Sequence, residues 1–246
     1  MKLFPTVDVA LVRTKNLMAT VTGYRYKDQL AGSRGKYMFR PTGGALSHVW
    51  LKDWGFLQAS SPTIYTRPEP MSFPEAPGIL PLTPRIEYTD TAGYFTNLFE
   101  FDAHFSTTET RRGFSLQASG ELKDKDWLTG GVGYDLGYRF SDSGYEKTIT
   151  LHYHDAWPAV NIIEPFIDDA GTSFEQLNPT TIIISKGGKK LRFELLSGNA
   201  VLNLGENREK YWAPYPALKA MPVILHIPSD KNRYIGTIRY RVVIIV

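Results

Sequence analysis

The sequence predicts an all-β protein, a large antiparallel β-sandwich with little helix. Short runs of β-branched and aromatic residues, which favour strands, recur along the chain, and aromatic residues make up 13% of it. Turn-like clusters such as Asp142-Ser143-Gly144 separate these runs in the way that hairpin loops do. No amphipathic helical period extends beyond about two turns, which argues against a helical fold.

The spacing of the runs predicts about a dozen strands. The clearest alternation covers residues 94–105, where Phe95, Asn97 and Phe99 fall on one face and Glu100 and Asp102 on the other. The predicted strands cover residues 17–26, 56–61, 63–66, 94–105, 114–122, 131–140, 147–153, 160–167, 181–185, 191–196, 223–227 and 234–246.

We expect residues 1–246 to form a single sandwich assembly, with a subdivision near 156–159 where the strand pattern is broken. Residues 67–85 are rich in proline, which cannot donate to a sheet ladder, so they cannot form a central strand. The sequence there favours a strap across the sandwich, and the alternative is a functional loop. Residues 124–128 are expected to form a short helical turn.

Composition excludes several classes of protein. The net charge of +3 is too small and too scattered to favour nucleic-acid binding. The absence of cysteine excludes disulfides, thiolate catalysis and cysteine-based zinc sites. No apolar run approaches the ~18 residues of a membrane-spanning helix, and the first twenty residues hold no secretory apolar region. A periplasmic or extracellular location is favoured if the chain belongs to a larger secreted protein.

The first candidate site surrounds His48, which follows the pair Gly43-Gly44 and precedes Trp50. Arg40 is suited to bidentate binding of a carboxylate. A histidine near an arginine and two tryptophans, Trp50 and Trp54, is a reasonable site for an acidic sugar. The alternative is a structural histidine in a strand whose glycine pair forms a bulge.

The second candidate site is a metal site at His152 and His154, because residues two apart in a strand point to the same face. A third ligand would have to come from elsewhere, such as Glu164 or His226. The alternative is a pair of exposed or hydrogen-bonded histidines. No cofactor is otherwise expected, and a divalent metal stays open.

Two further polar or aromatic clusters have both a functional and a structural interpretation. Glu100, Asp102 and His104 share a predicted strand face and could perform acid–base chemistry or bind a cation, but such a row is more often a solvated sheet face. The aromatic and proline residues of 211–216 could stack on sugar rings or close one end of the sandwich. No Walker A loop, dinucleotide fingerprint, Gly-x-Ser-x-Gly elbow or His-Glu-x-x-His motif is present.

Five stretches carry a family resemblance. Residues 38–50 (MFRPTGGALSHVW), 55–61 (GFLQASS) and 67–71 (RPEPM), continued by 81–87 (PLTPRIE) and 93–100 (GYFTNLFE), resemble the C-terminal β-domain of heparinase II/III-like bacterial proteins. The resemblance implies a supersandwich-like fold that follows an α-helical toroid in polysaccharide lyases. Such enzymes remove the proton beside a uronate carboxylate and expel the 4-linked sugar, using a Tyr or His base and groups that neutralise the carboxylate.

The chain departs from that family pattern in two respects. It contains no helical toroid, from which most of the family's key residues come, and the family's histidine-rich opening motif is not visible. The resemblance therefore implies a sandwich that is not an active lyase by itself, with a toroid as its partner. Arg40 and His48 carry over as substrate contacts, and Trp50, Tyr65 and Arg85 complete the predicted binding set.

Three functions remain open. We favour a β-sandwich module of a bacterial lyase-like protein that is structural or contacts an acidic polysaccharide. A self-sufficient uronate polysaccharide lyase is the first alternative, and it requires several titratable groups to converge in one pocket. A surface or outer-membrane structural protein is the second, suggested by the aromatic and glycine texture of residues 131–140. No nucleic acid and no transmembrane segment is expected.

Overall fold

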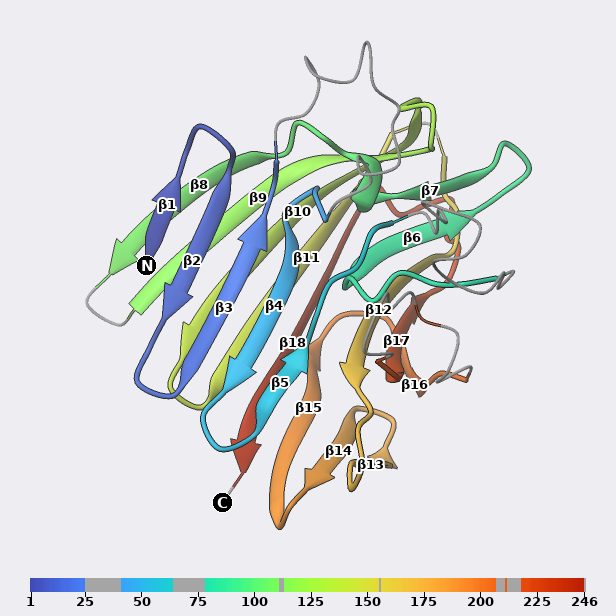
Figure 1. Ribbon diagram of the computed structural model, residues 1–246. Coiled ribbons are helices and arrows are strands. Elements are labelled where there is room, and N and C mark those ends of the chain that lie inside the picture. The colour runs from blue at the N-terminus through green and yellow to red at the C-terminus, as the bar shows by residue number, and fades with distance from the viewer. Residues whose placement is uncertain are drawn as a thin grey trace, which may run out of the picture.

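The computed structural model describes residues 1–24, 41–63, 78–110, 113–154, 156–206, 211 and 218–245. Within these residues the chain forms two antiparallel sheets and one short 3₁₀ turn, η2 (Asn97–Phe99), and no α-helix (Figure 1). The predicted all-β antiparallel fold is confirmed. No helix in this part of the chain is long and apolar enough to cross a membrane.

The smaller sheet is built from the N-terminal quarter of the chain. Its five strands pair in sequence order, each antiparallel to the next. These strands are β1 (Lys2–Phe4), β2 (Val9–Arg13), β3 (Leu17–Thr22), β4 (Ala45–Leu51) and β5 (Gly55–Gln58).

The larger sheet has 13 strands in the order β13-β14-β15-β18-β11-β10-β9-β7-β6-β12-β17-β16, with β8 paired to β9 beside this path. Its strands are β6 (Arg85–Thr89), β7 (Tyr94–Thr96), β8 (His104–Thr110), β9 (Gly113–Lys123), β10 (Thr129–Ser141), β11 (Gly144–Tyr153), β12 (Val160–Ile167), β13 (Ser173–Asn178), β14 (Thr181–Lys186), β15 (Lys189–Ser197), β16 (Val201–Leu204), β17 (Ala220–Ile227) and β18 (Ile235–Ile245).

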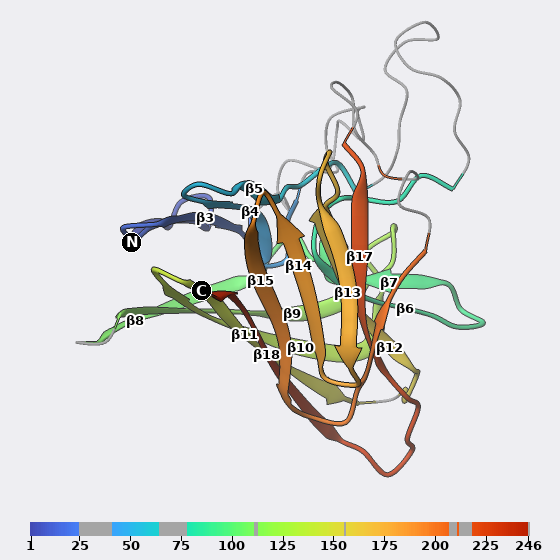
Figure 2. The same cartoon turned by 90° about the horizontal axis from the view of Figure 1, so that it is seen from below.

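The larger sheet curls until its two end strands meet. Gln176 Nε2 on β13 donates to the Leu202 carbonyl on β16 at 2.8 Å, although these strands lie at opposite ends of the sheet path. The rings of Phe166 on β12 and Phe193 on β15 also meet, edge to face with their centroids 6.2 Å apart. The sheet is therefore nearly closed, as Figure 2 shows for the strands around β13 and β17.

The small sheet covers one face of the large sheet over β9–β11 and β18, and the layers are visible in Figure 2. Alternation along the strands explains this core, since successive side chains point to opposite faces. On β10 every second side chain from Val132 to Phe140 is buried, and these side chains share one core with residues of the small sheet such as Val21, Val49 and Leu51.

The glycine pair ahead of β4 lets the small sheet approach the large one closely. Gly43 and Gly44 have φ of +67° and +75°, which glycine adopts without strain. The Tyr134 hydroxyl donates to the Gly43 carbonyl at 2.8 Å, and the Tyr138 hydroxyl donates to the Gly44 carbonyl at 2.7 Å. The buried Asn97 side chain donates to the Gly43 carbonyl as well.

A buried polar network lies between the sheets. Glu164 on β12 accepts from Lys147 Nζ at 2.8 Å, from Gln58 Nε2 at 2.6 Å and from the Tyr240 hydroxyl. The Tyr145 hydroxyl donates to Gln58 Oε1 at 2.7 Å. Lys147 is 1% exposed and Glu164 0%, so the network satisfies two opposite charges inside the core. Gln58 belongs to β5, so the network joins the two sheets.

Several predicted elements differ from the observed ones. The predicted strand 94–105 is interrupted, because the chain turns through η2 between β7 and β8. Residues 124–128 form a turn closed by the Asp124 carboxylate rather than a helical turn. Strands β1, β2, β4, β6, β13 and β16 lack a predicted counterpart, because they are short or weakly patterned.

The proline-rich strap is described only in part. Residues 78–84 run without a strand up to β6, and Leu82 is buried against Tyr211 and Ala220. The rest of the predicted strap, including Met71 and Phe73, lies outside the described residues.

We predict that replacing Lys147 by Met lowers the free energy of unfolding by about 3–5 kcal/mol, because the Glu164 charge is left buried and unpaired. Denaturant unfolding measures the effect. Lys125→Met is the matched control, since the Lys125 side chain is 70% exposed, and it should change stability by no more than about 0.5 kcal/mol. A K147M loss as small as that of the control would contradict this role for the network.

We predict that Gly43→Ala destabilises the fold by about 2–5 kcal/mol, the sum of a left-handed backbone cost and an overpacking cost. A Cβ at Gly43 would lie 1.8 Å from the Asn97 carbonyl oxygen. Gly55→Ala is the control, because Gly55 also has positive φ but an added Cβ meets nothing within 4 Å. Equal losses in thermal unfolding would show that the close approach at Gly43 is unimportant.

Candidate functional site

The outer faces of the two sheets each carry a hollow. The polar groove, a cavity of 510 Å³, lies over β8–β11 and combines carboxylates with imidazoles. The apolar groove, of 690 Å³, lies on the outer face of β1–β5 and combines aliphatic and aromatic side chains with two cations. The sequence predictions for His152 and His154 lead to the first hollow, and those for His48 and Trp50 lead to the second.

Strand register assembles the polar groove. Glu121 on β9 lies opposite Gly133 on β10, and Gly133 lies opposite His152 on β11. Because Gly133 has no side chain, His154 can approach Glu121 across it, with 3.8 Å between Nε2 and Oε1. The outward alternation of these strands therefore gathers acidic and imidazole groups into one hollow lined by Glu100, Asp102, His104, Ser119, Glu121, Lys123, Asp135, His152 and His154.

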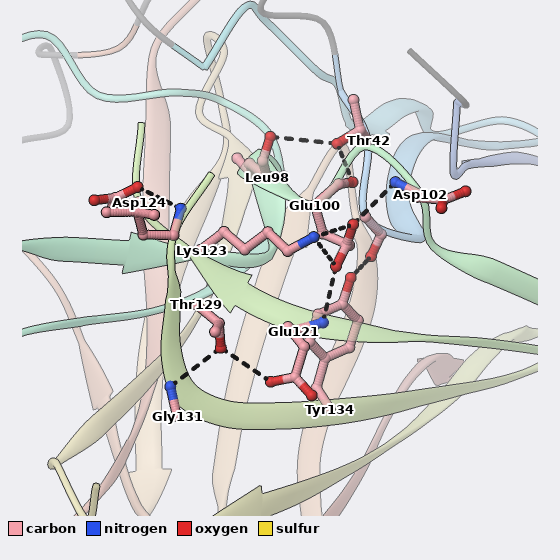
Figure 3. Close-up of polar contacts among 12 residues, drawn as sticks. Thr42, Leu98, Glu100, Asp102, Glu121, Lys123, Asp124, Thr129, Gly131 and Tyr134 are labelled. Carbon is pink, nitrogen blue, oxygen red and sulfur yellow. Dashed lines mark hydrogen bonds and ion pairs between the residues drawn. The ribbon is translucent and has the colours of Figure 1, made fainter. Parts of the chain in front are cut away.

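Glu100 forms the structural floor of the polar groove, as Figure 3 shows. Its carboxylate lies 2.9 Å from Lys123 Nζ and accepts from the backbone N–H groups of Asp102 at 2.9 Å and Glu121 at 3.1 Å. Its own carbonyl accepts from the Thr42 hydroxyl at 2.7 Å. Glu100 is buried, so the predicted solvated row of Glu100, Asp102 and His104 is wrong for this residue.

The two histidines predicted to bind a metal each face a separate carboxylate. His152 Nε2 lies 2.6 Å from Asp135 Oδ2, and His154 lies near Glu121. The suggested third ligands lie elsewhere, because Glu164 is held in the core network and His226 pairs with Asn161. Among the described residues no three His, Asp or Glu side chains are grouped to hold a metal ion. Metal binding at His152 and His154 stays a prediction.

Tyr134 lies beneath the polar groove and is held as a neutral phenol. Burial, and then the nearby Glu100 carboxylate, raise the pKa of Tyr134 well above its ordinary value. Its hydroxyl already donates to the Gly43 carbonyl. In this structure the Tyr134 hydroxyl therefore bonds across the seam between the two sheets.

The apolar groove brings together two of the residues predicted to contact substrate. His48 and Trp50 project from the outer face of β4, and the His48 ring meets the Phe56 ring edge to face, with centroids 6.4 Å apart. Burial lowers the pKa of His48, which favours the neutral imidazole. Lys2 and Arg13 add positive charge at this hollow. The aliphatic members of its lining include Met1, Leu11 and Met18.

The other predicted contacts do not join this groove. Arg85 is buried, and its guanidinium donates to Glu87 and to the Pro81 carbonyl at 3.0 Å, so this side chain is held within the fold. Trp54 is part of the core. Arg40 and Tyr65 lie outside the described residues, as do most of the predicted aromatic loop 211–216.

Sequence reasoning missed Glu121 and Asp135 as members of the polar groove. The available signal was the alternation of residues 131–140, in which glycines, Asp135 and Arg139 occupy the outward positions between buried aromatic and aliphatic residues. The alignment of Asp135 with His152 depends on the β10–β11 register, and that register was not assigned from the sequence.

Comparison with known proteins finds one family that matches nearly the whole chain. Residues 1–241 match the family described as Ulvan lyase C-terminal domain. A broad-specificity ulvan lyase of Formosa agariphila is 26% identical over 232 residues, which cover 91% of this chain and 35% of the relative. The chain thus spans about a third of the length of that curated relative.

Solved structures show the same fold. The heparan sulfate lyase of Pedobacter heparinus superposes with a TM-score of 0.63 at 11% identity, over 99% of this chain and 36% of the lyase. A galactose mutarotase-like protein from Lactobacillus casei superposes with a TM-score of 0.52 at 9% identity, over 96% of this chain and 100% of that protein. The fold resemblance to heparinase-type β-domains is confirmed.

We predict that Tyr134, Tyr138, Tyr145 and Tyr240 stay protonated when the folded chain is titrated through pH 10, since burial raises the pKa of each. Ionisation of these groups therefore favours the unfolded chain. The stability they contribute is fully present below their unfolded pKa of about 10 and is lost as pH rises above it.

The near-ultraviolet absorbance of tyrosinate measures how many tyrosines are ionised at each pH. The folded chain should show fewer ionised tyrosines near pH 11 than the chain in denaturant, where all 14 tyrosines titrate. Identical curves for the two states would contradict the burial of these hydroxyls.

Proposed function

The chain belongs to the Ulvan lyase C-terminal domain family, and from that premise we propose that it holds an acidic polysaccharide for a larger lyase without itself breaking the glycosidic bond. The apolar groove of β1–β5 is the contact surface. The observation that supports this most strongly is the grouping of Trp50, Phe56 and His48 beside Lys2 and Arg13 in one hollow.

The chemistry of the groove suits a charged sugar. Sugar rings have apolar faces that pack on exposed aromatic side chains, and Phe56 is 57% exposed. A uronate carboxylate would find a cation at Arg13, whose planar guanidinium binds carboxylates through two parallel hydrogen bonds. The neutral His48 imidazole can donate to or accept from a sugar hydroxyl.

The same groove is poorly equipped for the elimination reaction. That reaction needs a base at the proton beside the carboxylate and a group that neutralises the growing negative charge. Of the described side chains that line the apolar groove, His48 is the only imidazole, and burial lowers its pKa. We therefore assign binding to this domain and catalysis to the remainder of a longer lyase, which is its partner.

A self-sufficient lyase is the second candidate. It is favoured by the polar groove, where imidazoles from His104, His152 and His154 lie among carboxylates. Several titratable groups in one hollow are typical of active sites. The acidic character of this groove is unfavourable for a polyanion, which supports the binding role over this alternative.

We predict that the 246-residue chain binds ulvan in a salt-sensitive way and releases no unsaturated product. Trp50→Ala and Arg13→Ala should each weaken binding about tenfold, the loss expected from about 1.4 kcal/mol of stacking or ion pairing. Calorimetry measures binding, and the ultraviolet absorbance of the unsaturated sugar measures turnover.

Tyr234→Ala is the control, because Tyr234 is an exposed aromatic residue outside the groove. It should bind like the unaltered chain. Product formation by the chain alone would reject the binding role in favour of the second candidate. Binding that survives both groove substitutions would place the glycan elsewhere.

A further inference from the structure

We propose that the outer face of β9, β10, β11 and β18 around Gly137 and Arg139 is a second binding surface for an acidic polysaccharide, beside the acidic polar groove but separate from it. The inference rests on the proposed function, because it takes the ligand class from it. It adds a surface on the opposite side of the sandwich, away from the apolar groove of β1–β5.

Register defines this surface as rows of polar side chains across neighbouring strands. One row runs Ser119, Asp135, Thr150 and Thr237, and His104 on β8 extends it. The next row runs Gln117, Gly137, Thr148 and Arg239. These residues alternate with buried ones such as Leu136 and Tyr138, so they all project away from the core.

Strand β10 supplies a notched floor. Its outward positions read Gly133, Asp135, Gly137 and Arg139. Glu121 and His154 cover Gly133, so the open notch lies at Gly137, between the charged side chains of Asp135 and Arg139. A hollow of 420 Å³ lies over Gly137 and Arg139, and it shares Asp135 with the polar groove of 510 Å³. The hollow over Gly137 and Arg139, called the trough below, meets the polar groove at Asp135 and is large enough for a sugar ring.

Charge varies along this trough. At the Arg139 end, the guanidinium makes no hydrogen bond or ion pair with any described residue, while Arg241 is engaged by Glu194 at 2.7 Å. Arg239 reaches Glu146 only at 3.8 Å. Arg139 is thus the cation left available for a carboxylate or sulfate group, and arginine binds both through its fork of donors.

Residues in the middle of the trough can form hydrogen bonds with sugar hydroxyls. The hydroxyls of Thr150 and Thr237 lie 3.1 Å apart, and Asp135 is held by His152 at 2.6 Å. Carboxylates and hydroxyls of this kind accept and donate to sugar hydroxyls. The trough thus offers an anion-binding arginine at one end and hydroxyl-binding groups beside it, which is the pattern an acidic sugar chain presents.

Gly137→Val is the sharpest test, because an added Cβ at Gly137 meets only Thr148, at 3.6 Å. Valine favours strands, so the variant should fold as stably as the unaltered chain while filling the notch. Arg139→Gln removes the free cation. Asn203→Val is the matched control, since Asn203 is exposed on β16, away from this face.

Ulvan oligosaccharides are titrated into each variant in a Trp50→Ala background, which isolates the second surface. We expect G137V to weaken the remaining binding at least tenfold, R139Q to weaken it several-fold and reduce its salt dependence, and N203V to leave it unchanged. Unaltered binding in G137V and R139Q overturns the second surface, whatever Trp50→Ala does by itself.

The two proposals fail in different ways. Loss of all binding in Trp50→Ala, with G137V in the unaltered background without effect, keeps the apolar groove and overturns the trough. Full binding in Trp50→Ala that G137V removes keeps the trough and rejects the apolar groove. The absence of any binding to the unaltered chain overturns both.

Discussion

The fold depends on the buried ion pair between Lys147 and Glu164. Two opposite charges inside the core are tolerated only when each has partners, and Gln58 and Tyr240 complete the shell of the carboxylate. These four residues come from β5, β11, β12 and β18, so the network fixes the small sheet against the curled large sheet. The ring of Tyr138, 5.5 Å from Lys147 Nζ, adds a cation–π contact.

A second set of contacts joins the same two sheets at the start of β4. Gly43 and Gly44 bring backbone carbonyls to the buried hydroxyls of Tyr134 and Tyr138, so both hydroxyls are hydrogen-bonded inside the core. Together the two sets hold the sheets in one relative position. Because the sheets are fixed, the two outer faces and their hollows also keep one position relative to each other.

The two outer faces offer different chemistry to a polysaccharide. The small sheet presents aromatic rings beside cations, which suits stacking and carboxylate binding. The large sheet presents hydroxyls, carboxylates and a free arginine over a strand notched by glycine. A rigid two-layer domain with a binding surface on each side would keep a long substrate close to a catalytic partner, since two linked contacts raise the effective concentration of the chain.

Sequence alone determined the all-β class, the positions of most long strands and the special role of Gly43-Gly44, because alternation and glycine geometry are local properties. It grouped His48 and Trp50 as candidate sugar contacts, and the structure places both in the apolar groove. Only the tertiary structure decided that Arg85 is buried and that Lys147 finds Glu164. Contacts between strands far apart in sequence depend on register and on the curl of the sheet, which no local pattern encodes.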